Sequence, residues 1–151
     1  MASGDKLALD IVTIERKVWE DDGIDLVLIP GIEGEMGVLP NHAPVLTALR
    51  PGVVKIKKGD NEEFFAVGGG FVDVNPKKVV ILAQTAEHSE EIDLERAEAA
   101  YQRAKKVMEE EPDTSIGPSL TARAALARHE ARLKVVRRRR GGTGGVPHRQ
   151  Q

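Results

Sequence analysis

The sequence contains no cysteine, and aromatic residues make up only 3% of its 151 residues. Without cysteine there is no disulfide framework, no thiolate zinc site and no cysteine nucleophile. The longest apolar runs, such as Val79–Ala83, are far too short to cross a bilayer, and the first residues lack the pattern of a signal peptide. We therefore expect a soluble protein from a reducing compartment, with a core built from Val, Ile, Leu and Ala.

A catalytic constellation is also missing. The four histidines are scattered, and no pair has the spacing of a zinc-binding HExxH motif. No nucleophile–base pair or acid pair stands out either. His129 falls on an apolar helical stripe, where a packed or half-exposed side chain is the more common case. The sequence therefore predicts neither a catalytic site nor a metal site.

Residues 30–52 combine four prolines with closely spaced glycines. From Gly31 onward the glycines follow the spacing GxxGxxG, which fits neither the dinucleotide-binding motif nor the P-loop. Glu33 and Glu35 lie between them and would repel phosphate, and no lysine follows. The stretch is therefore interpreted as a turn-rich connector whose role depends on what it contacts.

The charge is unevenly distributed along the chain. From Ser119 to the end there are nine basic residues and one acid, Glu130, whereas the remainder holds 13 basic and 23 acidic residues. A basic end on an acidic body points to an acidic partner or to nucleic acid.

Short strand patterns run from Leu7 to Ala83, and turn signals separate them. The expected turns are Asp21–Gly23, Pro51–Gly52, Lys58–Asn61, Gly68–Gly70 and Asn75–Lys78. The glycine triplet also suits a bend or a close approach of two backbones. Strands at this spacing predict an antiparallel β-sandwich or barrel over residues 1–88.

The period then changes to that of amphipathic helices. The first expected stripe consists of Leu94, Ala97, Tyr101, Ala104 and Met108, and the second of Leu126, His129, Leu133 and Val136. Asp93 is a natural N-cap for the first helix, and Ile92 and Ala97 occupy the positions of a hydrophobic staple. Pro112–Pro118 forms the connector. We expect an antiparallel α-helical hairpin over residues 89–140 and a flexible, basic, glycine-rich tail over residues 141–151.

Several separated segments match one known family in order. They are GIEGEMGVLPNHAPVLTALRPGVVKI (Gly31–Ile56), FFAVGGGFVDV (Phe64–Val74), VVILAQTAE (Val79–Glu87) and IDLERA (Ile92–Ala97). Together they resemble the epsilon subunit of bacterial F-type ATP synthases, the rotary, proton-driven enzymes. The resemblance implies a non-catalytic central-stalk subunit that couples the catalytic head to the c ring.

The resemblance also implies partners. The sandwich would pack against the gamma subunit and the c-subunit ring, with Glu35 and His42 at the partner interface; a hydrogen bond that stabilises its own loop is the alternative for His42. The hairpin would lie folded on the sandwich, or extend into the alpha/beta catalytic head and inhibit ATP hydrolysis. The complex would place the chain peripherally at the cytoplasmic face of the bacterial plasma membrane.

Some bacterial members of this family bind ATP as a regulatory ligand, through the motif Ile/Leu-Asp-x-x-Arg-Ala and outlying charged residues. Ile92, Asp93, Arg96 and Ala97 fill the motif, and Glu87, Arg103, Arg128 and Arg132 stand at the outlying positions. Arginine suits a triphosphate because its guanidinium forms forked hydrogen bonds. The alternative is that the motif serves only as helix cap and staple, with solvated arginines. No cofactor is required in either case.

The runner-up hypothesis is a small nucleic-acid-binding or adaptor protein that uses the basic C-terminal helix. The acidic body and the single Trp and single Tyr speak against it, because few side chains can stack on bases. We therefore expect no nucleic-acid partner.

Overall fold

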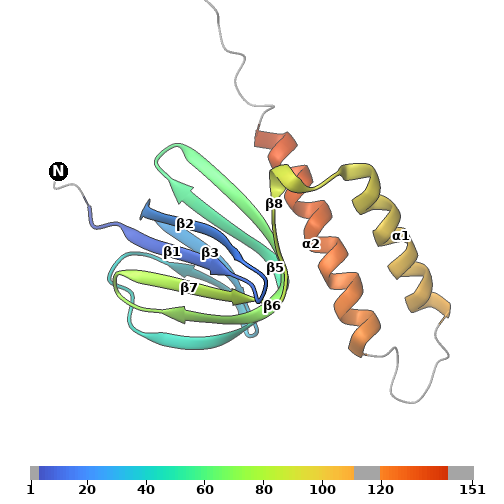
Figure 1. Cartoon of the computed structure of the whole chain (residues 1–151), viewed down its shortest axis with the longest axis horizontal. Helices are drawn as coiled ribbons and strands as arrows, with labels where there is room; N and C mark the ends of the chain where they lie inside the picture. The colour runs from blue at the N-terminus through green and yellow to red at the C-terminus, as the bar shows by residue number, and fades with distance from the viewer. Residues whose placement is uncertain (1–3, 111–119, 143–151) are drawn as a thin grey trace, which may run out of the picture.

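A computed structural model describes residues 4–110 and 120–142, and it has two parts: a β-sandwich and a pair of helices packed on its side (Figure 1). The predicted connector Pro112–Pro118 and most of the predicted tail, residues 143–151, lie outside the described residues. The predicted fold class, a sandwich followed by a helical hairpin, is confirmed.

The sandwich is one continuous sheet that folds over itself. Its strands are β1 (Leu7–Val12), β2 (Lys17–Ile24), β3 (Leu26–Gly31), β4 (Gly34–Val38), β5 (Val45–Lys58), β6 (Asn61–Val74), β7 (Lys78–Ala83) and β8 (Ala86–His88). The order is β2-β1-β7-β6-β5-β3-β4, and β8 also pairs with β6. The pairing is antiparallel except between β1 and β7, which run parallel.

Three expected turns are wrong, because the strands continue through them. Asp21–Gly23 lies within β2, where a register shift against β1 absorbs the extra residue. Pro51–Gly52 lies within β5, opposite Gly68 and its neighbour in β6. Proline cannot donate a hydrogen bond, and the N–H of Gly68 opposite it donates to the carbonyl of Thr85, outside the β5–β6 pair. The pairing of β5 with β6 nevertheless continues on both sides of Pro51.

The glycine triplet lies inside β6 and allows close backbone approaches there. A Cβ on Gly68 would lie 2.1 Å from Thr85 Oγ1 and 3.0 Å from Arg128 Cδ. A Cβ on Gly70, which has a φ of 137°, would lie 2.0 Å from the carbonyl oxygen of Leu82. The prediction of a close approach is confirmed, whereas the predicted break in the strand is wrong. The other two turns, at Lys58–Asn61 and Asn75–Lys78, are confirmed.

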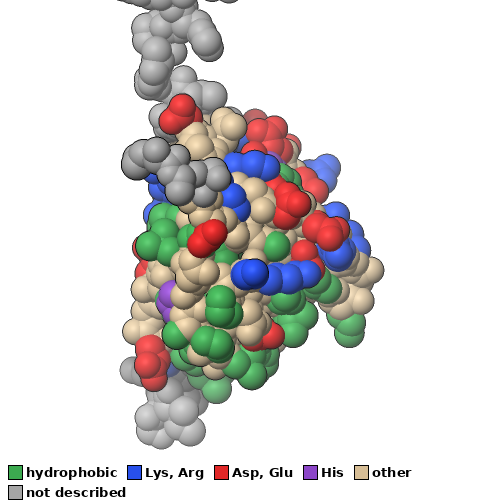
Figure 2. All heavy atoms as spheres, turned by 90° about the vertical axis from the view of Figure 1, so that its left-hand side faces the viewer, with side chains coloured by type: hydrophobic (Ala, Val, Ile, Leu, Met, Phe, Trp, Pro, Cys, Tyr) green, Lys and Arg blue, Asp and Glu red, His purple; other side chains and the backbone are tan. Residues whose placement is uncertain are grey.

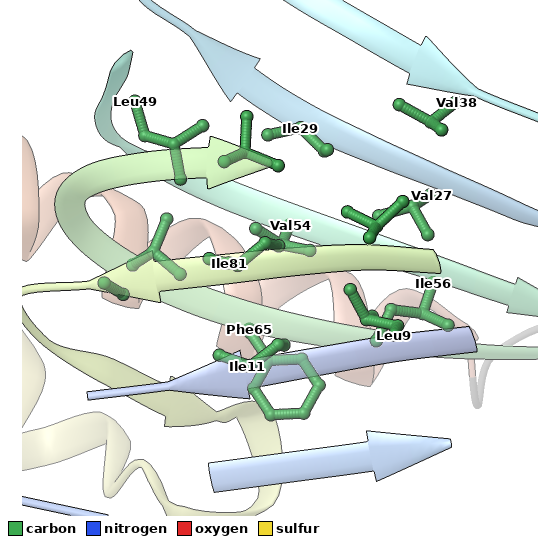
Figure 3. Close-up of a cluster of buried hydrophobic side chains, with 14 of the residues drawn as sticks. Leu9, Ile11, Val27, Ile29, Val38, Leu49, Val54, Ile56, Phe65 and Ile81 are labelled. Atoms are coloured by element: carbon green, nitrogen blue, oxygen red, sulfur yellow. The ribbon is translucent and has the colours of Figure 1, made fainter. Parts of the chain in front are cut away.

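The core between the layers of the sandwich is almost wholly aliphatic, as the composition predicts. Figure 3 shows Leu9, Ile11, Val27 and Ile29 directed into it from β1 and β3. These four side chains are fully buried, and so is Phe65, the largest side chain of the cluster. The cluster holds no residue of the helices, so this core belongs to the strands alone.

The helical part begins with a short 3₁₀ turn, η1 (Ser89–Glu91), followed by α1 (Leu94–Glu110) and α2 (Leu120–Gly142). α1 and α2 run antiparallel, and α2 lies between α1 and strands β5 and β6 (Figure 1). None of these helices is long and apolar enough to span a membrane. The sandwich contacts α2, which is the helix that carries Arg128, Arg132 and the arginines at 137–140.

The predicted start of α1 is confirmed. Asp93 Oδ1 accepts a hydrogen bond of 2.9 Å from the N–H of Arg96, so Asp93 is the N-cap. Ile92 and Ala97 are buried in a second apolar cluster, as a staple requires. Their partners come from β6 and α2: Phe64, Ala66, Ala131, Leu133, Val135 and Val136.

We expect residues 1–88 to fold without the helices, because the first core consists only of strand residues. Circular dichroism of a chain ending at His88 should show a β spectrum and a cooperative thermal transition. The transition should lie below that of the full chain, since removal of α2 exposes Phe64 and Ala66. A spectrum of an unfolded chain would contradict the division at residue 88.

Candidate nucleotide-binding site between the sandwich and the helices

An ion pair joins the helices to the sandwich. Arg132 on α2 donates from Nε to Oε2 of Glu87 on β8, over 3.1 Å. The two side chains are 24% and 39% exposed, so solvent reaches the pair. Because water and salt screen such a pair, it can open at a small energetic cost.

Arg128 lies one helical turn before Arg132 and packs on the sheet. The aliphatic part of its side chain passes over Gly68, where any side chain would obstruct it. A hollow of about 140 Å³ lies here, and its walls include Thr85, Glu87, Arg128 and Arg132. Two arginines thus line a small cavity between α2 and the sandwich.

A second hollow, of about 260 Å³, lies between α1 and α2. Arg103 on α1 contributes to its wall, together with alanines from both helices. His129 lines this hollow as well as the first one. The two hollows therefore lie on either side of one histidine.

The charges of these residues act on the pKa of His129. Burial is the main cause that lowers its pKa, and Arg132, Arg128 and Arg103 lower it further, while Glu87 acts in the opposite sense. Three cations and one anion thus lie within electrostatic reach of one ring. The site has an excess of positive charge and several forked donors, which favours an anion with several oxygens.

The structure divides the predicted ATP-site residues into two groups. It brings together Glu87, Arg103, Arg128 and Arg132 around His129. The four motif residues instead form the start of α1, where Ile92, Asp93 and Ala97 act as staple and cap and Arg96 is exposed. Arg96 lies about 10 Å along the helix axis from Arg103. His129, which its apolar stripe predicts to be packed or half-exposed, is half-buried and lines both hollows.

His88 anchors the junction between the two parts. Its ring stacks on Trp19, with 5.6 Å between ring centroids, and meets Phe65 edge-on. Its Nε2 lies 2.6 Å from Oε2 of Glu63, and its Nδ1 accepts a hydrogen bond from the N–H of Glu90. The residue before η1 is thus fixed to the sandwich, so a movement of the helices would have its pivot beyond His88.

The basic end of α2 also contacts the sandwich side. The guanidinium of Arg138 lies 6.0 Å from the centroid of the Phe64 ring, and Arg139 donates to the carbonyl of Ser89. Arg137 is exposed. Arg138 is exposed as well, although its guanidinium lies over the Phe64 ring, whereas Arg139 is half-buried.

The two predicted partner-interface residues lie in different surroundings. Glu35 on β4 is exposed and lines hollows that Arg138 of α2 also lines. His42 lies in the loop after β4, where its Nδ1 is 2.7 Å from the carbonyl oxygen of Ala43. The contact expected as the alternative role of His42 is present. Its assignment to a partner interface stays a prediction, as does that of Glu35.

Metal ligands do not gather in the part of the chain that the structure describes, which holds no group of three or more His, Asp or Glu able to bind an ion.

Comparisons with known proteins agree with this architecture. The family "ATP synthase, Delta/Epsilon chain, beta-sandwich domain" matches residues 6–89, and "ATP synthase, Delta/Epsilon chain, long alpha-helix domain" matches residues 90–137. An ATP synthase epsilon chain of Dehalococcoides mccartyi is 48% identical over 137 residues, which is 89% of this chain and 95% of that protein. One of Staphylococcus haemolyticus is 44% identical over 128 residues, or 85% of this chain and 94% of that protein.

A similar solved structure belongs to a rotary complex. A chain of the Euglena gracilis mitochondrial ATP synthase, in a structure of its OSCP/F1/c-ring, superposes with a TM-score of 0.71 at 26% identity. The match covers 89% of this chain and 84% of that chain. The two-part fold, the two family matches and the bacterial relatives agree, and the chain belongs to the epsilon-subunit family of bacterial F-type ATP synthases.

Proposed function

We propose that this epsilon subunit regulates ATP hydrolysis with its helices, in addition to joining the catalytic head to the c ring. The observation that carries the proposal is the way in which α2 is held. Arg132 pairs with Glu87 of β8, Arg138 lies over the ring of Phe64 in β6, and Arg139 donates to Ser89 of η1, beside the apolar cluster that α2 forms with β6. The Arg132–Glu87 pair is open to solvent, so this link opens more readily than a buried one.

The folded form keeps these arginines away from other partners. Arg132, Arg138 and Arg139 all contact the rest of the chain in this arrangement. An extended hairpin would release them toward an acidic surface of the alpha/beta head, where their charge would hold α2 in an inhibitory position. The folded form is therefore the permissive state in this proposal.

The same contacts favour regulation over nucleic-acid binding. A nucleic-acid-binding helix keeps its cations free for phosphates. Here three arginines of α2 contact the chain itself, and α2 is covered by the sandwich on one side and by α1 on the other. We propose that the basic helix serves a protein partner.

ATP is the ligand that we propose for the site around His129. Glu87, Arg103, Arg128 and Arg132 converge there from β8, α1 and α2, so that a bound triphosphate would tie the helices to the sandwich. A ligand that binds only the folded form shifts the equilibrium toward it. Inhibition should therefore ease as ATP rises.

For the rotor partners we propose an apolar patch on the outside of the sheet, formed by Ile14, Leu46, Phe71 and Leu82. These side chains are 50 to 99% exposed. Phe71 pairs with Leu82 across β6 and β7, and Ile14 borders the same hollow of about 490 Å³. Exposed apolar surface of this kind is typical of a protein interface. We propose that the gamma subunit covers it.

The end of the sandwich that points away from the helices is the proposed face toward the c ring. Figure 2 shows hydrophobic side chains gathered over the lower part of this end. Leu39, in the same loop as His42, is 59% exposed. In this arrangement the subunit would lie peripherally at the cytoplasmic face of the bacterial plasma membrane.

The patch can be tested with Phe71→Thr combined with Leu82→Thr, since threonine keeps a high strand propensity. Removing two large apolar contacts should weaken binding to the gamma subunit about tenfold or more. The measurement is copurification of the tagged chain with gamma and the c ring. Leu120→Thr is the matched control, because Leu120 is 82% exposed on α2. Recovery of gamma at the wild-type level by the double variant would reject the patch.

A further inference from the structure

His129 occupies a position where three neighbouring arginines make a further positive charge unfavourable and an anionic ligand favourable. We propose that His129 is a nucleotide-contacting residue that takes up a proton when a triphosphate binds, so that this site binds ATP more tightly as the pH falls. The inference rests on the proposed ATP site and adds to it a residue and a pH dependence.

The geometry places the ring at the centre of the site. His129 follows Arg128 directly on α2, and it lines both the hollow toward the sandwich and the hollow toward α1. Its Nδ1 is buried and has no hydrogen-bond partner among the described residues. A buried polar atom normally has a partner. A phosphate oxygen in either hollow would supply one, provided that Nδ1 carries a proton.

Three of the elements packed around the ring contribute a charge. Arg128 and Arg132 come from α2 itself, Arg103 from α1 and Glu87 from β8. In the empty site burial and the three arginines lower the pKa of His129, against the weaker effect of Glu87. The ring is therefore neutral near pH 7 when no nucleotide is bound.

A bound triphosphate changes the sign of this field. Its oxygens neutralise the arginines and place negative charge beside the ring, which favours the imidazolium form. Linkage then requires proton uptake on binding, and one full proton corresponds to about a tenfold change in affinity per pH unit. The proton ends on Nδ1, from where it can be donated to a phosphate oxygen.

The empty and the occupied hairpin should respond to acid in opposite ways. Without nucleotide, the lowered pKa of His129 means that the open form binds a proton more tightly than the folded form. The stabilisation of the folded hairpin by neutral His129 is thus present above the ordinary histidine pKa of about 6.5 and is lost as the pH falls below it. With ATP bound, the same protonation stabilises the folded form.

The test is calorimetry of ATP binding to the full chain at pH 7, in two buffers with different ionisation enthalpies. The slope of the observed heat against ionisation enthalpy gives the number of protons taken up. We compare the wild type with His129→Gln, which stays neutral, and with His42→Gln as the matched control outside the site. On binding ATP, the wild type and His42→Gln should each take up more protons than His129→Gln does, by roughly half a proton or more.

The outcomes separate the two proposals. No ATP heat with the wild type rejects the ATP site itself. ATP heat with the same proton number in all three chains overturns the role of His129 and leaves the ATP site standing. If circular dichroism shows that His129→Gln has lost its helices, NMR titration of the His129 ring in the wild type decides. Its titration midpoint should rise when ATP is added, and an unchanged midpoint would reject the inference.

Discussion

Replacing Arg128 or Arg132 with alanine should weaken ATP binding by the full chain at least about tenfold. Both arginines line the hollow between α2 and the sandwich. A hydrogen bond to a charged group contributes about 1.5 to 3 kcal/mol, which corresponds to roughly a 10- to 100-fold change in affinity. Arg132→Ala should have the larger effect, because it also leaves the Glu87 carboxylate unpaired beside the phosphates.

Calorimetry at millimolar ATP measures both variants, and Arg123→Ala is the matched control. Arg123 is an exposed arginine on the same helix, so this variant changes the net charge equally without touching the hollow. It should bind ATP as the wild type does. Wild-type affinity in both Arg128→Ala and Arg132→Ala would exclude the site, whatever the control shows.

The beginning of the helical part was predictable from the sequence because its signals are local. The cap at Asp93 and the staple of Ile92 and Ala97 depend only on residues within about one turn of each other. The change of hydrophobic period after Glu87 likewise marks the boundary between the strands and the helices. Such features can be read from the sequence because they do not depend on contacts with distant residues.

The continuity of β5 and β6 was not predictable in the same way. Pro51 and the glycines at 68–70 are usually turn signals, but here β5 and β6 stay paired on both sides of Pro51, and Gly68 donates to Thr85 beyond that pair. That bond joins residues 17 positions apart in the sequence. A tertiary contact therefore decides between a turn and a bent strand.

The packing of α2 exceeded what one apolar stripe can indicate. Leu133 and Val136 are buried as predicted, but Ala131 and Val135 are buried as well. The reason is that α2 contacts the sandwich on one side and α1 on the other (Figure 1). A helix covered on two sides has two buried faces, so a single stripe in its hydrophobic periodicity does not indicate both of them.

The sequence named charged residues that the fold brings together, but it did not place His129 among them. Glu87, Arg103, Arg128 and Arg132 lie around this ring, and their role as an ATP site stays a proposal. The role of His129 depends on which groups surround it in three dimensions. A single histidine on an apolar stripe carries no such information in the sequence.

The second large effect that we expect is on ATP hydrolysis by the catalytic head. Adding the full chain to a catalytic head that lacks epsilon should slow ATP hydrolysis severalfold at low ATP. The physical reason is the release of Arg132, Arg138 and Arg139 from their contacts with Glu87, Phe64 and Ser89 when the hairpin opens. ATP bound at the folded hairpin opposes this release, so the slowing should diminish as ATP increases.

The most direct test is the hydrolysis rate of an epsilon-depleted head with gamma present, measured over a range of ATP concentrations with the full chain and with residues 1–88. Both chains carry the proposed gamma patch, so they differ only in the helices and the tail. The account predicts that the full chain lowers the rate at low ATP and progressively less at high ATP, while residues 1–88 leave it unchanged. Equal rates with the two chains at every ATP concentration would contradict it.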